Sequence, residues 1–355
     1  MGEDKNQLFK GGVGMSMKKV LMMMLILTMA FFAVVGCDEG GEPADTENGE
    51  DTNGEDVAEE DLEIDIIVGF GAGGSNDLSA RYMAQAMRDH GVVANIINMP
   101  GSSGTEAVYH VSQQSPDSMT FMWAHSPMMI FEPAMGDRGY EFDDFVPVGT
   151  LASATFGVAT RADMPWGDDF EALVEYIEEN PGEVSFGGQG LGNLAHFLHN
   201  KALPLEELDY TYAPLGGGAD VLLGLEGGHV DIGAVSMAAV SPMLESGTAN
   251  MLYHQQILTD TIPGHEDVPS ITEFGIEASS PHPMALWAPV GTDEAVIQRI
   301  TEAMEAASNN PLLSELYEPN GMLVHYLNPE ETAELFNGFR EDLLPEFLDW
   351  AEQYQ

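Results

Sequence analysis

The chain has 355 residues, of which 44% are hydrophobic, so it is long enough for two lobes and apolar enough to form real cores. Its 59 acidic residues outnumber 11 basic ones and give a net charge of −48, which excludes the basic surface that nucleic-acid binding requires and argues against a polybasic membrane contact. Self-repulsion at this density destabilises a compact chain in dilute buffer, whereas at molar salt the Debye length falls to roughly 3 Å. The composition therefore favours a halophilic protein exposed to brine over the plainer alternative of an acidic surface that serves solubility.

The first 36 residues are typical of an export signal. Lys18 and Lys19 form a short positive region, and residues 20–35 form an apolar run that is short for a membrane span. The run ends in Val-Val-Gly-Cys37, which resembles the cleavage and lipidation site of bacterial lipoproteins, and Cys37 is the single cysteine of the chain. We predict a signal peptide with an N-terminal extension over 1–36 and an extracytoplasmic protein that the lipid on Cys37 anchors to the cell membrane. The alternative is a buried cysteine that follows a membrane anchor.

An acidic segment follows the cysteine. Twelve of the 24 residues from 38 to 61 are acidic, and Gly, Asn, Pro and Thr stand between them. Such a segment cannot bury a core, and its charges repel one another. Residues 37–61 are therefore predicted to be an extended tether, with the folded part beginning near Leu62.

From Leu62 onward, apolar strand segments alternate with amphipathic helix segments, a pattern typical of an α/β fold with largely parallel sheets. The first set has expected strands over 64–68, 94–99 and 120–124 and expected helices over 76–89 and 104–114. A long apolar extended segment over 146–160 leads to a second set, with strands over 184–186 and 230–234 and helices over 168–179, 192–203, 219–226 and 238–246. A strand over 284–288 returns to the first set, and helices over 292–308, 311–317 and 329–352 close the chain.

These elements predict two α/β lobes with a ligand cleft between them. One lobe is expected to comprise residues 62–156 and 283–355, and the other residues 157–282.

Glycines at 69, 71 and 74 follow the first expected strand with the G-x-G-x-x-G spacing of a dinucleotide-binding loop. That loop is normally accompanied by an acidic residue at the end of the second strand, whereas this strand ends in Asn98 and Met99. Export would also separate the protein from the nicotinamide cofactors of the cell. Glycines before a helix start are equally suited to bind an anion, because the first helical N–H groups are unpaired and lie at the positive end of the helix dipole. We favour the anion site.

Motifs in a fixed order relate the chain to a known family. They occupy residues 67–77 with Arg81, 97–104, 116–117, 186–196, 217–231, 267–275 and 287–292. In this order they resemble the motifs of the substrate receptors of tripartite tricarboxylate transporters, the Bug-type periplasmic proteins. The resemblance covers nearly all of residues 64–350. It implies a type II, two-lobed (Venus-flytrap) binding protein without catalytic activity, a small di- or tricarboxylate or related organic acid as ligand, and integral membrane transporter subunits as partners.

Two departures from the family pattern bear on the ligand. Gly69 stands where the family has a proline, which loosens the entry to the first loop but keeps its N–H donors. Leu215 and Gly216 replace an aromatic and a basic residue, so contacts from those side chains are lost. The identity of the carboxylate therefore stays open.

The candidate ligand contacts cluster at two helix starts. The first loop and helix supply Gly73, Gly74, Ser75, Asn76 and Asp77, and Ser126 follows the third strand; the second lobe supplies Gln189, Gly190, Asn193, His196 and, from the family resemblance, Gly217.

Each candidate has a structural alternative. The first loop could be a plain turn with a helix cap, and Asp77, a poor partner for an anion, could instead support the first helical turn. His196 could be satisfied by the neighbouring lobe. His196 and His199 stand three residues apart, but no cysteine and no acidic third ligand accompany them, so we predict no metal and no cofactor.

Three functional hypotheses follow. The leading one is a transport receptor that closes around a carboxylate. The second is a surface sensor of the same fold that passes the ligand signal to a signalling partner. The third is an enzyme, which the sequence does not indicate, because it contains no G-x-S-x-G motif, no catalytic cysteine and no carboxylate pair with an interpretable spacing.

Overall fold

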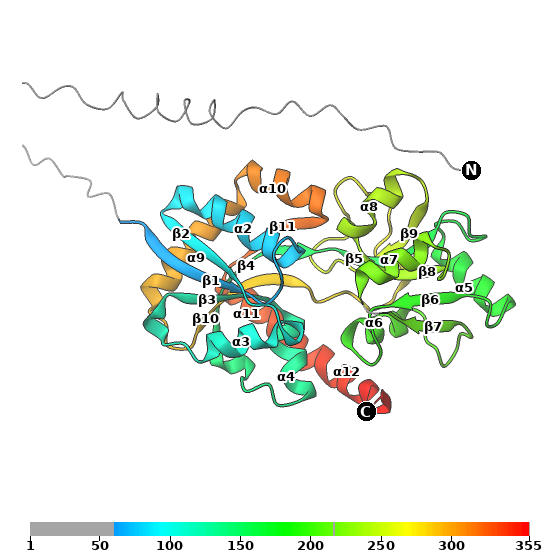
Figure 1. Ribbon diagram of the computed structural model, residues 1–355, viewed down its shortest axis with the longest axis horizontal. Coiled ribbons are helices and arrows are strands. Elements are labelled where there is room, and N and C mark those ends of the chain that lie inside the picture. The colour runs from blue at the N-terminus through cyan, green and yellow to red at the C-terminus, as the bar shows by residue number, and fades with distance from the viewer. Residues whose placement is uncertain (1–59, 216, 355) are drawn as a thin grey trace, which may run out of the picture. The chain divides into compact units, whose positions relative to one another are not determined.

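The computed structural model describes residues 60–354 apart from Gly216 (Figure 1). The predicted signal peptide, the predicted lipidation at Cys37 and all but the last two residues of the predicted tether lie outside the described residues. In the described ranges, no helix has the length and apolar character that crossing a membrane requires.

Two mixed β-sheets form the centres of two lobes (Figure 1). The first sheet has the strand order β11-β4-β10-β3-β1-β2 and the second the order β7-β6-β8-β5-β9. The first comprises β1 (Leu62–Val68), β2 (Val92–Asn98), β3 (Thr120–His125), β4 (Phe145–Ala154), β10 (Pro283–Pro289) and β11 (Met322–Leu327). The second comprises β5 (Phe156–Arg161), β6 (Ser185–Gly188), β7 (Thr211–Pro214), β8 (Ile232–Ser236) and β9 (Ala249–His254). The predicted two-lobed α/β fold is confirmed.

Helices cover both faces of the first sheet because its strands are apolar on both sides. In β1, Ile64, Ile66 and Val68 pack into one core, whereas Ile67 packs into the other. The first core also receives residues of α2 (Ser75–Met87), α9 (Glu294–Ser308) and α10 (Pro311–Tyr317). The second receives residues of α3 (Thr105–Ser112) and α11 (Pro329–Gly338), and the short α4 (Glu132–Met135) adjoins it.

The second lobe is built in the same way. One core lies between its sheet and α5 (Phe170–Glu179) together with α6 (Leu194–Ala202), and another between the sheet and α7 (Gly218–Glu226) together with α8 (Met237–Glu245). Asp169 begins α5 by accepting a hydrogen bond from the Ala172 N–H, so the side-chain cap fixes where the helix starts.

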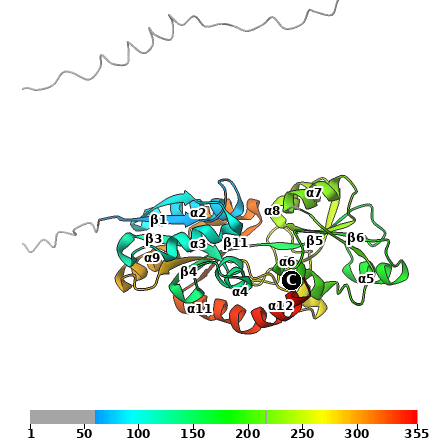
Figure 2. The same ribbon diagram turned by 60° about the horizontal axis from the view of Figure 1, so that its bottom comes forward.

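The lobes are connected by extended segments and by the C-terminal helix. Thr155 alone separates β4 in the first sheet from β5 in the second, and its N–H donates to the carbonyl of Gly321. Residues 255–282 return the chain to the first sheet. The last helix, α12 (Leu344–Ala351), crosses to α6, where Phe347 and Phe197 belong to one core cluster (Figure 2).

The structure corrects three expectations. The sheets are mixed rather than largely parallel, because the strands that leave and re-enter each lobe, β4, β5 and β10, pair antiparallel with their neighbours. The expected helix over 329–352 is divided into α11 and α12 by a wide π-helical turn at residues 339–343, just before Pro345. Three strands, β7, β9 and β11, were not expected, and all three lie at sheet edges, where a strand pairs on one side only.

Candidate functional site

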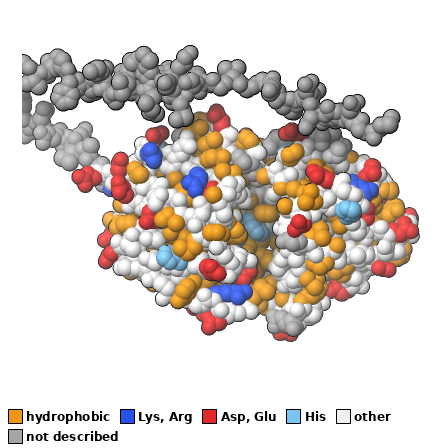
Figure 3. All heavy atoms as spheres, in the orientation of Figure 1, with side chains coloured by type: hydrophobic (Ala, Val, Ile, Leu, Met, Phe, Trp, Pro, Cys, Tyr) orange, Lys and Arg blue, Asp and Glu red, His pale blue; other side chains and the backbone are white. Residues whose placement is uncertain are grey.

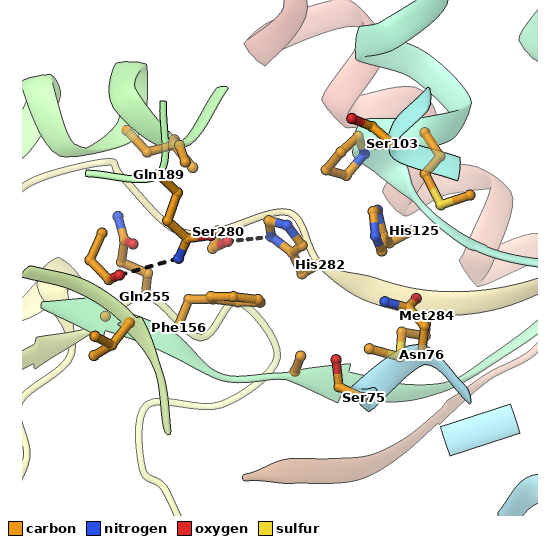
Figure 4. A pocket seen from close by; sticks show the side chains of 18 of the residues that line it. Ser75, Asn76, Ser103, His125, Phe156, Gln189, Gln255, Ser280, His282 and Met284 are labelled. Atoms are coloured by element: carbon orange, nitrogen blue, oxygen red, sulfur yellow. Dashed lines mark hydrogen bonds between the residues drawn. The ribbon is translucent and has the colours of Figure 1, made fainter. Parts of the chain in front are cut away.

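A cavity of about 330 Å³ lies between the two lobes (Figure 4). The first lobe lines it with residues from α2, β3 and the turn after β3, and the second lobe with residues from β5, β8, α6 and the loop after β6. The space-filling view shows a hollow between the lobes, with the pale blue of histidine inside it (Figure 3). The volume is at the small end of the range of ligand pockets, roughly 300–1,000 Å³.

The start of α2 forms one wall of this cavity. Ser75 and Asn76 line it, and Gly74, the residue before the helix, provides no side-chain cap. Gly73 turns the chain with a φ of 86°, a conformation that favours glycine. The first N–H groups of α2 are therefore left without a cap beside the cavity, and they lie at the positive end of the helix dipole.

Asp77 holds the loop before α2 in place. Its carboxylate accepts hydrogen bonds from the Gly73 N–H (2.8 Å), from Asn98 (2.8 Å) and from Arg81 (2.9 Å), and the side chain is buried. Burial alone would raise the pKa of Asp77, but the bonds from Arg81, Gly73 and Asn98 outweigh it and lower that pKa. An ionised, fully engaged carboxylate fixes the loop geometry and does not line the cavity.

Three histidines contribute to the cavity wall. His125 ends β3, His282 precedes β10, and His199 lies on α6. The rings of His125 and His282 lie 5.2 Å apart, and Phe156 packs 4.6 Å from the ring of His282. Burial lowers the pKa of His125 to about 4 and that of His199 to about 3. These rings are therefore neutral at neutral pH in the unliganded protein.

The second lobe contributes two amide side chains whose nitrogens are already engaged. The Nε2 of Gln189 donates to the carbonyl of Ala234 (3.2 Å), and the Nε2 of Gln255 donates to the carbonyl of Ala278 (2.8 Å). Each bond fixes its amide, so the amide oxygens have a defined orientation.

Polar atoms without partners concentrate at this cavity. In the described part of the chain, Asn76 Oδ1, His125 Nδ1 and His199 Nδ1 are buried without a hydrogen-bond partner, and all three residues line the cavity. A buried polar group without a partner costs roughly 1–3 kcal/mol, which a ligand can recover by supplying one. No lysine or arginine is among the described lining residues, and Glu132, the lining carboxylate, is paired with Arg138 at 2.9 Å.

The sequence-predicted candidates divide into two groups. Ser75, Asn76 and Gln189 line the cavity, and Gly73 and Gly74 directly precede the first two. The others do not line the cavity and have other roles. Ser126 donates to the carbonyl of Pro281 (2.6 Å), and the carbonyl of Gly190 accepts from Tyr212. Asn193 caps α6, His196 accepts from the Gly192 N–H and stacks on Tyr212, and Gly217 precedes α7. Asp77 belongs to this second group. The candidate ligand contacts remain predictions.

Residues that sequence reasoning missed include His125, His282, Ser103, Gln255 and Ser280. His125, which lines the cavity, directly precedes the predicted Ser126, which does not. No local signal identifies His282, because it lies near His125 only through the pairing of β10 with β3, which places Met284 opposite His125. Among the described residues, no group of three potential metal ligands is close enough to hold an ion.

Residues 79–340 match the sequence profile of the tripartite tricarboxylate transporter family receptor. A UPF0065 protein of Bordetella pertussis is 29% identical over 262 residues, which cover 73% of this chain and 80% of that protein. A ligand-free TctC solute-binding protein from Polaromonas superposes with a TM-score of 0.69 at 23% identity, over 81% of this chain and 98% of that one. MatC from Rhodopseudomonas palustris with bound malate superposes with a TM-score of 0.62 at 23% identity, over 82% of this chain and 99% of that one.

These structural likenesses show a shared two-lobed fold. A receptor family binds solutes rather than transforming them, so the sequence match also confirms the prediction that the chain is not an enzyme. The chain belongs to the tripartite tricarboxylate transporter receptor family.

Proposed function

We propose that this receptor binds a small organic carboxylate in the cavity between its lobes, outside the cytoplasm, and delivers it to the integral membrane subunits of a tripartite tricarboxylate-type transporter. The observation that carries the proposal is the start of α2 at the cavity wall, where the residue before the helix provides no side-chain cap and where Ser75 and Asn76 line the same cavity as His125. Free helical N–H groups bind carboxylates through directional hydrogen bonds and the helix dipole, without needing a lysine or arginine. Malate in a protein of the same fold supports a ligand of this class.

The two lobes proposed here are 62–156 with 283–355, and 157–282. Their closure around the ligand would bring the second-lobe residue Gln189 against an anion held at α2. Because one cavity takes residues from both lobes, one ligand per chain is expected.

Membrane attachment through Cys37 and a halophilic habitat complete the proposal. The apolar run before Cys37 and the acidic segment after it support lipidation, and the net charge of −48 supports a protein that needs salt to fold and to accept an anion. Binding is therefore best measured in molar sodium chloride.

The test is a thermal-shift screen of di- and tricarboxylates, acidic amino acids and aromatic acids, followed by calorimetry on the acid that gives the largest shift. We expect 1:1 binding that Gly74→Leu abolishes, because a leucine side chain would stand beside the first-turn N–H groups. The fold should tolerate it, since a Cβ at Gly74 meets no atom closer than 3.7 Å.

Gly136→Leu is the matched control, because a Cβ at that glycine meets nothing within 4 Å and the residue does not line the cavity. Binding that survives Gly74→Leu unchanged would place the site elsewhere. If no acid of the panel binds, the proposed function is wrong.

A further inference from the structure

Two histidines from distant parts of the chain face each other in the cavity, and the start of α2 lies beside them (Figure 4). We propose that His125 and His282 form a proton-accepting pair, so that the receptor binds its organic anion together with a proton taken from solvent. This inference rests on the proposed function and adds to it the chemical form in which the ligand is bound.

The geometry keeps the pair together and oriented. His125 ends β3 and His282 immediately precedes β10, and these two strands pair antiparallel, with Met284 opposite His125. The ring of Phe70 lies 5.8 Å from that of His125, and the ring of Phe156 lies 4.6 Å from that of His282. The aromatic neighbours confine both imidazoles without providing hydrogen-bond partners to their nitrogens.

Each ring retains hydrogen-bonding capacity. His282 Nδ1 is hydrogen-bonded to the hydroxyl of Ser280, which fixes the ring and leaves Nε2 for the cavity. His125 is 7% exposed, and its Nδ1 is buried without a partner among the described residues. An incoming carboxylate can accept an N–H from either ring.

In the empty cavity both rings are neutral. Burial lowers the pKa of His125 to about 4, and burial together with the nearby His125 lowers the pKa of His282 well below its usual value. The other titratable groups lining the cavity are His199, whose pKa burial lowers to about 3, and Glu132, which is paired with Arg138. Among the described residues that line the cavity, no positively charged side chain is therefore present to offset the charge of a carboxylate.

A bound carboxylate changes this balance because it brings a negative charge against the pair. An opposite charge at hydrogen-bond distance favours imidazolium, so the pKa of one histidine rises in the complex while its neighbour stays neutral. A group whose pKa is higher in the complex than in the free protein takes up a proton on binding. The affinity therefore increases as pH falls from the pKa in the complex toward the pKa in the free protein, by at most roughly tenfold per pH unit for one proton.

The first measurement is calorimetry of the full chain with the acid that gives the largest thermal shift, in several buffers of different ionisation enthalpy. We expect an uptake of roughly 0.3–1 proton per ligand near pH 6, and an affinity that weakens between about pH 6 and about pH 8, where simple carboxylic acids are already ionised. An uptake below roughly a tenth of a proton, with constant affinity over that interval, would overturn the inference.

Variants assign the proton to the pair. His282→Gln, at a half-buried position, and His125→Gln should each reduce proton uptake and flatten the pH dependence. The exposed His229→Gln serves as the control and should leave both unchanged. If both glutamine variants keep the wild-type proton uptake, the proton goes elsewhere and the inference fails; because the wild-type measurement needs no variant, a variant that does not fold leaves the test intact.

The two proposals fail in different ways. A panel in which no carboxylate binds defeats the proposed function and this inference together. Carboxylate binding without proton uptake keeps the proposed function and overturns this inference alone.

Discussion

The starts of α2 and α6 show that two similar sequence patterns can serve opposite purposes. Both helices follow a glycine-containing loop after a strand, and residues near both starts line the same cavity. Gly74, the residue before α2, provides no side-chain cap, whereas Asn193 caps α6 by accepting from the His196 N–H at 3.0 Å. The start of α2 therefore lacks a side-chain cap of the kind that Asn193 provides for α6.

The difference extends to the surroundings of each start. The loop before α2 is fixed from outside the cavity by Asp77, with Arg81 and Asn98 as its partners. The start of α6 is instead packed by aromatic rings, because His196 stacks on Tyr212 and contacts Trp350 and Tyr354 from the C-terminal segment. An anchored but open helix start is suited to binding, and a capped and packed one is suited to rigidity.

Of the variants that test this difference between α2 and α6, Ser75→Pro is expected to have the largest effect, a loss of carboxylate affinity. Ser75 is the first residue of α2, where proline fits the helical backbone, and Gly74 before it is already extended (φ −80°, ψ 169°). The change removes the N–H donor of residue 75 at the cavity wall and keeps the helix intact. Losing a hydrogen bond to a charged group, about 1.5–3 kcal/mol, weakens carboxylate binding roughly 10- to 100-fold, as calorimetry would measure.

Glu294→Pro is the control for that variant, because Glu294 is the exposed first residue of α9 and does not line the cavity. It should leave the affinity unchanged. Equal affinity of Ser75→Pro and the wild type would show that the α2 donors do not hold the ligand.

A smaller and different effect is expected from Asn193→Ala. The substitution removes the cap of α6 and the bond from Asn193 to the carbonyl of Gln189 (2.8 Å). We expect the free energy of unfolding to fall by about 1–2 kcal/mol in a chemical denaturation experiment. The affinity should change less than in Ser75→Pro, and a larger loss of affinity would mean that α6 binds ligand as α2 does.

The smallest effect is expected from Lys201→Met, which removes the ion pair between α6 and Glu346 of α12 (2.9 Å). Both side chains are partly exposed, so the pair contributes about 0.2–1 kcal/mol to the free energy of unfolding. Because salt screens exposed charges, the loss should shrink from dilute buffer to molar sodium chloride. A loss that does not shrink with salt would show that the ion pair with Glu346 is not what Lys201 contributes; its Nζ also lies 5.6 Å from the centre of the Phe197 ring.

Much of the fold was predictable because its signals are local. The glycines before α2, Asp169 before α5 and the apolar periodicity of α9 act within a few residues, and the corresponding helices begin within two residues of expectation. The edge strands β7, β9 and β11 were missed, since each depends on a partner strand that is distant in the chain or on one-sided pairing.

The sequence by itself determined the two-lobed α/β class and the receptor family, because their signals are local motifs and periodicities. It also placed Ser75 and Asn76 at a helix start after a glycine loop, and both residues line the cavity. It did not determine which of two such starts is open, because the cap at Asn193 and the ring contacts of His196 are decided by packing. Nor did it reveal His125 and His282 as neighbours: they face each other through the antiparallel pairing of β3 with β10, and burial by residues from both lobes makes them neutral. Only the tertiary structure brings such distant side chains together and removes them from water.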